Sequence, residues 1–417
     1  MTIHIVTYKE LRNRILKTPF ASIGVDQIHR KIELLWYNSS GGDYGRRNLG
    51  ISEKMIIVVG TYSGGGGSEG GGGGGEGGGV ITASSITVGI DELRTIALDP
   101  NTLDVISFLS PGYCLLADTE YLYCIEAGNE ENYFVIIDYN GEIIYRQPTV
   151  AIPSALLPKR VILPEYVKDK IHIFDVDSLS FIKDIELHNV TLPLSDITYF
   201  YTTYEQSGTY YLVKIDKDGN ILASSPVSSQ IASSVHDIVA SEDKIIVYNY
   251  SNMFQIFDKK DLKLIRTETL NDISLYALSC NNGYLYIPYT RGKENNYYDY
   301  GIIKYDIKNF RIEFDNILLT NSNSRYTMCR GCLGIYPDDY VYLNVLYNNG
   351  KYMVIGIDNN GEKIWELETT RYSIPVLTPS GKLIINTPHG LCIVDRMTGE
   401  EIICNPNIYY VYNYFIV

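Results

Sequence analysis

The chain has 417 residues, of which 45% are hydrophobic and 20% are charged, and its net charge is −14. This length allows two or three ordinary domains or one large repeat array, with room for a sizeable core. The acidic balance argues against a nucleic-acid partner, because phosphate binding needs a basic face. The high count of 37 Tyr suits strands and half-buried surfaces.

The N-terminal segment, residues 1–45, is expected to be a hairpin or extension outside the main repeats. Residues 20–38 resemble the hairpin that recurs later in the chain, with Val25 just before Asp26. The basic start is not followed by a long apolar run, so we expect no cleavable signal peptide. No stretch reaches about 18 apolar residues, so no membrane span is expected.

Residues 46–407 carry the repeats, and a glycine-rich insertion at 64–79 interrupts the first of them. Gly-rich runs behave as flexible spacers, so a surface loop or spacer is one interpretation. Packing against other chains or against the rest of the fold is the other. A phosphate-binding role is not indicated, because a Gly-rich motif has that meaning only between a strand and a helix.

One hairpin recurs along this segment, and its clearest copy is VIGIDNNGEKIWELE, from Val354 to Glu368. The Asp opens a turn in which its side chain accepts backbone N–H bonds, and a following Gly supplies the positive φ of a short hairpin. Successive copies of the Asp are 37 to 52 residues apart, near the period of a four-stranded propeller blade. The repeat Asp residues are Asp99, Asp138, Asp175, Asp216, Asp258, Asp306, Asp358 and Asp395.

Apolar residues hold fixed positions around each repeat Asp. The residue before the Asp is apolar in all copies, and the residue two positions earlier is apolar except at His172 and Gln255, which predicts a strand with one buried face. Seven residues after the Asp an apolar side chain returns in every copy but one, at Glu313, and we expect this position to be core. These residues are Ile106, Tyr145, Ile182, Ala223, Ile265, Trp365 and Ile402.

A second strand–turn–strand pattern lies between the Asp hairpins, for example in residues 236–251, 276–289 and 375–388. Two hairpins per period make a four-stranded antiparallel sheet, and such sheets bury both faces by stacking radially around an axis. The sequence therefore predicts an all-β fold, a β-propeller of four-stranded antiparallel blades. We expect eight blades, with seven or nine as alternatives. The N-terminal hairpin within residues 1–45 and a closing strand at residues 408–417 are expected to seal the ring or to form an interaction surface.

The cysteines suggest bridges without proving them. Two pairs flank predicted hairpins and can form cross-strand disulfides, while a third, closely spaced pair can be a disulfide, a redox pair or half of a zinc site. Small buried thiols are the alternative for all of them. Disulfides would indicate an oxidising compartment or the cytosol of a hyperthermophile. The pairs are Cys114 with Cys124, Cys392 with Cys404, and Cys329 with Cys332.

The repeat, apolar-x-apolar-Asp-x-x-Gly followed by apolar residues and Trp, resembles that of quinoprotein-type (PQQ-like) propellers over residues 90–406. Propellers with this repeat include quinone-dependent dehydrogenases and non-catalytic assembly scaffolds, so the resemblance implies one of these two roles for the chain. Catalytic members hold a quinone in the central funnel beside Ca²⁺, with a catalytic Asp and usually a Trp platform. This chain departs from them, since it has only Trp36 and Trp365 and no adjacent Cys-Cys pair.

Other polar residues point to no reaction. The six His are scattered without metal-ligand spacing, and turn formation is sufficient to explain the repeat Asp, so we expect no catalytic residues, metal or cofactor. Clustered Tyr residues are more informative, because exposed Tyr favours interfaces. The candidates for an interface are Tyr297, Tyr298, Tyr300, Tyr409 and Tyr410.

The sequence favours a non-enzymatic propeller that serves as a docking, attachment or assembly module. Its composition, rich in Ile and Tyr with a pure Gly tract, is similar to that of virion proteins of archaeal viruses. The expected partners are other protein subunits, in a homo-oligomer or a virion, and cell-surface glycans are a further candidate. A virion or extracellular location is expected, with the cytoplasm as the alternative. A quinone-dependent dehydrogenase and a carbohydrate-binding propeller are the competing functions.

Overall fold

A computed structural model gives the fold of the chain in discontinuous stretches. The described residues are 56–62, 80–83, 86–89, 93–99, 101–110, 113–118, 120–127, 132–149, 151–165, 169–191, 193–196, 198–232, 236–241, 243–249, 252–275, 278–281, 283–292, 298–322, 328–335, 340–347, 350–370, 375–377 and 382–416. Residues 1–45, the Gly-rich run at 64–79 and Tyr297 therefore lie outside them. Within the described ranges, no helix is long and apolar enough to cross a membrane.

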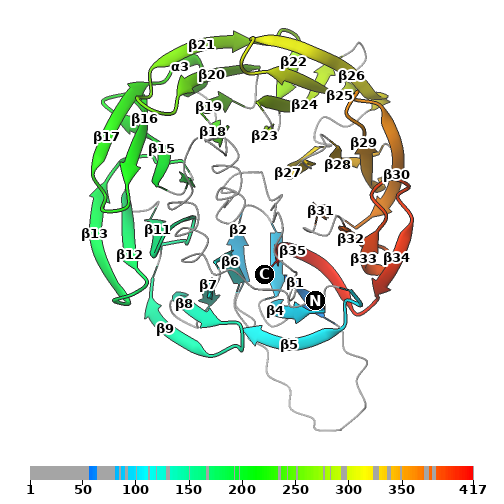
Figure 1. Ribbon diagram of the computed structural model, residues 1–417, viewed down its shortest axis with the longest axis horizontal. Helices are drawn as coiled ribbons and strands as arrows, with labels where there is room; N and C mark the ends of the chain where they lie inside the picture. The colour runs from blue at the N-terminus through cyan, green and yellow to red at the C-terminus, as the bar shows by residue number, and fades with distance from the viewer. Residues whose placement is uncertain are drawn as a thin grey trace, which may run out of the picture.

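The described strands form eight sheets of at least four strands, all antiparallel, and Figure 1 shows these sheets arranged in a ring. This architecture is the predicted β-propeller. The count of eight sheets is made over the described residues alone. The first four sheets contain β35 (Ile408–Ile416), β1 (Ile56–Tyr62), β4 (Leu93–Leu98) and β5 (Val105–Ser110); β6 (Tyr113–Ala117), β7 (Tyr121–Ala127), β8 (Asn132–Asp138) and β9 (Ile143–Pro148); β10 (Ala155–Leu157), β11 (Arg160–Glu165), β12 (Lys170–Asp175) and β13 (Ser180–Glu186); and β14 (Leu194–Ser195), β15 (Tyr199–Gln206), β16 (Thr209–Asp216) and β17 (Ile221–Pro226).

The second half of the ring repeats the same plan. Its sheets contain β18 (His236–Ala240), β19 (Lys244–Asn249), β20 (Met253–Asp258) and β21 (Leu264–Thr269); β22 (Ile273–Leu275), β23 (Ser279–Asn281), β24 (Tyr284–Gly292), β25 (Tyr298–Asp306) and β26 (Arg311–Ser322); β27 (Met328–Ile335), β28 (Val341–Leu346), β29 (Tyr352–Ile357) and β30 (Lys363–Thr369); and β31 (Val376–Leu377), β32 (Leu383–Thr387), β33 (Gly390–Val394) and β34 (Glu401–Asn405). A short helix, α3 (Ser229–Ala232), and a separate hairpin of β2 (Val80–Ala83) and β3 (Ile86–Gly89) complete the described elements.

The two ends of the described chain meet in one sheet, here called the closing sheet. Its strand order is β35-β1-β4-β5, so the C-terminal strand pairs antiparallel with the first described strand. Side chains also join this sheet to the last one: Lys382 donates to Asn101, and Asn405 Nδ2 donates to the carbonyl oxygen of Leu103 at 2.8 Å. Because both ends of the described chain contribute strands to one sheet, this sheet closes the ring.

The repeat Asp opens the turn between the third and the outermost strand of each sheet, and the turns are of two kinds. In three of them a Gly follows three residues later with positive φ, and its N–H donates to the carbonyl of the Asp. In the other five the positive-φ residue comes four residues after the Asp, and it is Leu or Phe in four of those five. The first kind contains Gly141, Gly219 and Gly361, and the second contains Leu103, Leu179, Leu262, Phe310 and Gly399.

The second kind of turn was not predicted, and burial explains it. A left-handed backbone at a non-Gly residue is unfavourable, so something must compensate for it. Leu103 and Leu262 are fully buried, and Leu262 belongs to the hydrophobic cluster shared by two neighbouring sheets. The turn therefore holds a strained backbone in place by inserting an apolar side chain into the core.

The core consists of a series of clusters, each packed between two neighbouring sheets. One cluster joins Ile171 and Ile173 of β12 to Phe200 and Val213 of the following sheet. The residue before each repeat Asp is at most 3% exposed in all copies, as the alternation predicts. Many of the largest buried side chains are tyrosines, which accounts for part of the Tyr-rich composition. The fully buried tyrosines are Tyr123, Tyr201, Tyr248, Tyr286, Tyr289, Tyr300 and Tyr342.

Candidate functional site

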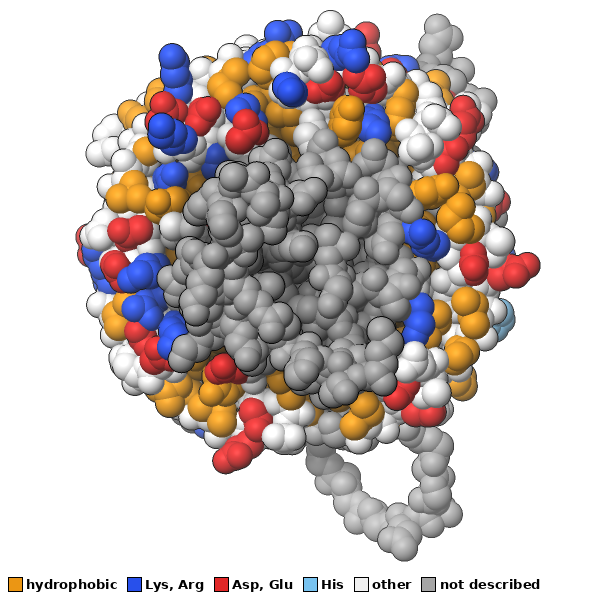
Figure 2. All heavy atoms as spheres, viewed as in Figure 1, with side chains coloured by type: hydrophobic (Ala, Val, Ile, Leu, Met, Phe, Trp, Pro, Cys, Tyr) orange, Lys and Arg blue, Asp and Glu red, His pale blue; other side chains and the backbone are white. Residues whose placement is uncertain are grey.

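Exposed aliphatic side chains are concentrated on the outermost strand of each sheet. Figure 1 places these strands along the outer circumference, and Figure 2 shows hydrophobic side chains between charged ones around it. Each of the eight outermost strands carries at least one large aliphatic side chain that is 37% exposed or more. We call these residues the rim aliphatics: Ile106, Ile143, Ile182, Ile221, Leu222, Leu264, Ile265, Ile312, Ile317, Ile364, Ile402 and Ile403.

This pattern corrects the expectation that the position seven residues after the Asp is core. Ile106, Ile182, Ile265 and Ile402 occupy that position and are 54%, 43%, 39% and 59% exposed. The physical reason is that the outermost strand has no strand beyond it and lies at the margin of the contact between sheets. Apolar residues there lie on a surface of the ring.

At the same position Tyr145 and Ala223 are half-buried against core clusters, and Trp365 is buried because its neighbours are small. It is only 7% exposed, its Nε1 donates to the carbonyl oxygen of Arg396 at 2.8 Å, and its ring stacks on Tyr342. A Cβ added at Gly356 or Gly399 would lie 2.3 Å or 2.8 Å from ring atoms. The two glycines therefore make the space that the indole occupies between sheets.

The rim aliphatics share one end of the strands. All except Ile317 lie within eight residues after a repeat Asp, and so near the Asp turns. The most exposed of them are Ile402 at 59%, Ile143 at 55% and Ile106 at 54%. They belong to β34, β9 and β5, which are consecutive outermost strands at the closing sheet (Figure 1). We call these three residues the rim patch.

The repeat Asp residues act within their own turns. In all eight copies Oδ1 accepts a hydrogen bond from a backbone N–H two to four residues later. The N–H groups of Asn101, Glu142 and Met397 thereby hold the pKa of Asp99, Asp138 and Asp395, respectively, below the ordinary value. Each carboxylate is thus occupied by its own backbone, which is the turn role predicted for it.

Four of the six cysteines singled out in the sequence form disulfides. Cys114 bonds Cys124 between β6 and β7, and Cys392 bonds Cys404 between β33 and β34. Both are directly opposed cross-strand pairs. Cys329 and Cys332 both fall in β27, in a stretch whose side chains are outside the described part of the structure.

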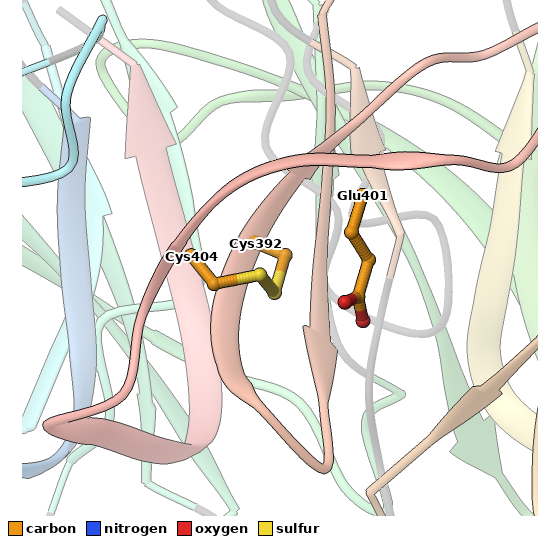
Figure 3. Close-up of side chains that lie close together, drawn as sticks. All are labelled: Cys392, Glu401 and Cys404. Carbon is orange, nitrogen blue, oxygen red and sulfur yellow. A yellow bond between two sulfur atoms is a disulfide. The ribbon is translucent and has the colours of Figure 1, made fainter.

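The second disulfide lies beside an acid and an imidazole. The sulfur atoms of Cys392 and Cys404 and a carboxylate oxygen of Glu401 lie within 4.8 Å of one another. Figure 3 draws these three side chains. His389 Nδ1 is 2.8 Å from Glu401 Oε2, and Thr387 Oγ1 is 3.2 Å from Cys392 Sγ. This grouping was not predicted from the sequence, where the only signal for it was a His and a Glu close to the two cysteines, His389 before β33 and Glu401 on β34.

His172, which breaks the apolar pattern, lies between two carboxylates. Its Nε2 is 3.0 Å from Glu165 Oε2, and its Nδ1 is 2.7 Å from Asp184 Oδ1. Lys170 Nζ lies 3.7 Å from the other oxygen of Asp184. This polar network replaces the apolar contact made at the same repeat position elsewhere, and it ties three strands of one sheet together.

Lys214 is a buried amine with a structural role. It is 8% exposed, and its Nζ donates to the carbonyl oxygens of Lys259 and Lys260 at 3.1 and 3.2 Å. Burial lowers its pKa, and the ammonium lies 4.0 Å from the centre of the Tyr199 ring. Because its bonds go to a turn of the next sheet, Lys214 links two blades.

The predicted tyrosine interface is wrong at Tyr300. That residue is fully buried, in the cluster between the sixth and seventh sheets, because strand β25 is an inner strand of its blade. Tyr298 is half-buried against the same cluster. Tyr409 and Tyr410 lie on β35, where the structure describes the strand but not these side chains.

Comparison with known proteins supports the fold. No model of a protein family matches the chain, and no curated protein matches its sequence. Among solved structures, the chain is similar to dihydro-heme d1 dehydrogenase NirN in complex with DHE, with a TM-score of 0.55, 11% identity, and coverage of 90% of this chain and 80% of that one. It is also similar to AztD from Citrobacter koseri, with a TM-score of 0.55, 10% identity, and coverage of 87% and 97%. At such identities the likeness shows the β-propeller fold alone.

Proposed function

We propose that the chain is a non-enzymatic β-propeller that serves as a docking or assembly module for other protein subunits. The observation that carries this proposal is the row of rim aliphatics on the outermost strands. Exposed apolar groups that gather in one region mark interaction surfaces, whereas single exposed residues need no explanation. Here one kind of strand bears them in every sheet, and the three most exposed belong to the outermost strands of three consecutive sheets.

The backbone of the same strands adds to this proposal. An outermost strand has hydrogen-bonding groups on its free edge, which a partner strand or loop can engage. Charged side chains lie among the aliphatics, including the ion pair of Arg146 with Glu126 on the sheet of Ile143. An aliphatic centre with a polar rim is the usual make-up of a protein interface.

The composition of the innermost strands favours a docking role over quinone chemistry. A quinone and Ca²⁺ site in the funnel needs acidic and amide oxygens around the axis. Among the innermost strands that the structure describes, namely β6, β10, β14, β18, β22, β23, β27, β31 and β35, the only acidic residue is Asp237 and the only amide residues are Asn281 and Asn413. The resemblance to PQQ-like repeats is thus explained by the turn and strand pattern.

The proposed setting is extracellular, and a virion coat is one such assembly. Two cross-strand disulfides fit a protein that works in an oxidising environment.

The test removes the rim patch and leaves the rest of the rim intact. In the triple variant Ile106→Thr, Ile143→Thr, Ile402→Thr, the β-branched shape is retained but the surface becomes polar. The matched control is Ile221→Thr, Ile265→Thr, Ile312→Thr, on three consecutive outermost strands elsewhere in the ring. Native mass spectrometry and sedimentation velocity of protein from its source would measure association with itself and with other subunits.

We expect association to be lost in the first variant and retained in the control. Loss in both would place the interface around the whole rim. A wild-type chain that stays monomeric at all concentrations and carries no other subunit from its source would contradict the proposal. A retained quinone or sugar mass would support the catalytic or glycan-binding alternatives.

A further inference from the structure

The cluster at the second disulfide contains more ligand groups than a structural bridge needs. In a regular strand, residues three apart face opposite sides, so Glu401 and Cys404 would be separated. The register of β33 with β34 shifts between Ile393 and Val394, and this bulge places both residues on one side. Figure 3 shows the carboxylate of Glu401 beside the two sulfur atoms.

Two further groups complete the surroundings. His389, in the turn between β32 and β33, contacts Glu401 through Nδ1, and its own side chain is 72% exposed. The Thr387 hydroxyl is close enough to Cys392 Sγ to donate a hydrogen bond to it. Two sulfur atoms, a carboxylate and an imidazole are the ligand types of tetrahedral zinc sites.

We propose that this cluster is a redox-gated site for a divalent metal of the zinc class. In the oxidised chain the sulfur atoms are joined to each other and are not ligands. In the reduced chain the thiolates of Cys392 and Cys404 and the carboxylate of Glu401 bind the ion, and His389, whose Nδ1 contacts Glu401 Oε2, holds that carboxylate in place. Thiolate ligands favour Zn²⁺ over Mg²⁺ or Ca²⁺, which prefer oxygen.

The gating step is a thiol–disulfide exchange with a dithiol. One thiolate of the dithiol attacks Cys404 Sγ, the partly buried sulfur, and the bond to Cys392 Sγ breaks. The second thiol of the dithiol then releases Cys404, so the dithiol leaves as a cyclic disulfide and both cysteines are reduced. Binding of Zn²⁺ displaces one proton from each cysteine.

The other disulfide provides an internal comparison. Cys114 and Cys124 belong to a cluster formed by Ala97, Leu109, Leu122 and Val135, among other apolar residues. Among the described residues, only the second pair belongs to a group of metal-ligating side chains. The two pairs should thus differ in metal binding after reduction, although both are cross-strand bridges.

The test uses a background in which Cys280, Cys329 and Cys332 are replaced by Ser, so that only the two bridges remain. The chain is reduced with a dithiol, desalted without oxygen and titrated with Zn²⁺ against a chromophoric chelator. Co²⁺ is the spectroscopic probe, since tetrahedral thiolate ligation gives intense visible bands. We expect one ion per reduced chain and none at this site in the oxidised chain.

Variants assign the ligands. Cys392→Ser with Cys404→Ser should abolish binding, and Glu401→Gln should weaken it at least about 10-fold, as losses of ligand-sphere groups do. The matched control, Cys114→Ser with Cys124→Ser, should bind as the background does. Equal affinity for the Cys392 and Cys404 variant, or no binding by the reduced chain, would overturn the proposal. If reduction unfolds the chain, recovery of the strand circular dichroism signal on adding Zn²⁺ supports the site, and failure to recover refutes it.

Discussion

The third and the outermost strand of each blade follow the same hairpin but differ in what their apolar residues do. In the third sheet, Phe174 on β12 is fully buried, whereas Ile182 on the adjacent β13 is 43% exposed. A third strand packs against neighbours on both of its faces, while an outermost strand has a free edge and lies at the margin of the core. Apolar sequence therefore indicates stability in one strand and surface chemistry in the other.

The largest expected difference comes from truncating one residue on each strand. Phe174→Ala removes a ring that contacts Phe134, Tyr145 and Phe181, so we expect a loss of about 3–5 kcal/mol of unfolding free energy. Ile182→Ala should change the unfolding free energy by no more than about 0.5 kcal/mol. Denaturant unfolding followed by circular dichroism measures the unfolding free energy of both variants. Similar losses in the two would contradict the difference between the third and the outermost strand.

A second prediction concerns the turns that insert a side chain into the core. Leu262→Ala should lower the unfolding free energy by about 2–4 kcal/mol, because the fully buried side chain leaves a cavity while the left-handed backbone remains strained. The control is Leu264→Ala, two residues later on β21, where the side chain is 41% exposed. Equal unfolding free energies of the two variants would show that burial of the Leu262 side chain does not stabilise the fold.

Of the two kinds of turn, the sequence predicted the one with Gly and missed the one with Leu or Phe. The Asp period, the buried residue before each Asp and the positive-φ Gly residues follow from local patterns, and they were sufficient to predict four-stranded sheets in a propeller. The Leu and Phe turns were missed because burial stabilises a backbone conformation that their own preferences oppose. Trp365 fits the core only because Gly356 and Gly399 leave room for it.

The candidate sites depend on features that no local pattern contains. The rim aliphatics are exposed because their strands are the outermost ones of their sheets. The spacing of the repeats along the sequence does not reveal that position. Glu401 approaches Cys392 and Cys404 through a bulge, and bulges are poorly marked in sequence. His172 was recognised as an exception to the apolar pattern, but its partners Glu165 and Asp184 come from two other strands.

A third prediction uses the pH dependence of the Asp turns, where the contribution is smaller. The pKa of Asp216 is lowered: burial opposes the ionised form, but the bonds from Asn220 and from the N–H of Asp218 outweigh it. A lowered pKa stabilises the fold above the ordinary carboxyl pKa of about 3.9, and that stabilisation is lost as pH falls through the folded value. Asp216→Ala should therefore lower the unfolding free energy by about 1 kcal/mol at neutral pH, like the loss of a capping side chain.

Melting temperatures measured at neutral and acidic pH check this prediction. The difference in melting temperature between wild type and Asp216→Ala, here called the gap, should become smaller in acid. A gap that stays constant or widens would assign the effect to packing.

The smallest effect on stability is expected at the rim patch, and there the comparison of strands is sharpest. Each Ile→Thr change at Ile106, Ile143 or Ile402 replaces a side chain that is more than half exposed in the isolated chain, so the unfolding free energy should change by less than about 0.5 kcal/mol per site. The same triple variant is expected to lose association with other subunits. A melting temperature measured at a concentration where wild type is monomeric separates the two effects, because subunit binding itself stabilises the folded chain. An unchanged melting temperature together with lost association would show that the aliphatic residues of the outermost strands serve to bind a partner. A large drop in the melting temperature of the monomer would instead show that these side chains belong to the core, as the sequence pattern first suggested for Ile106 and Ile402.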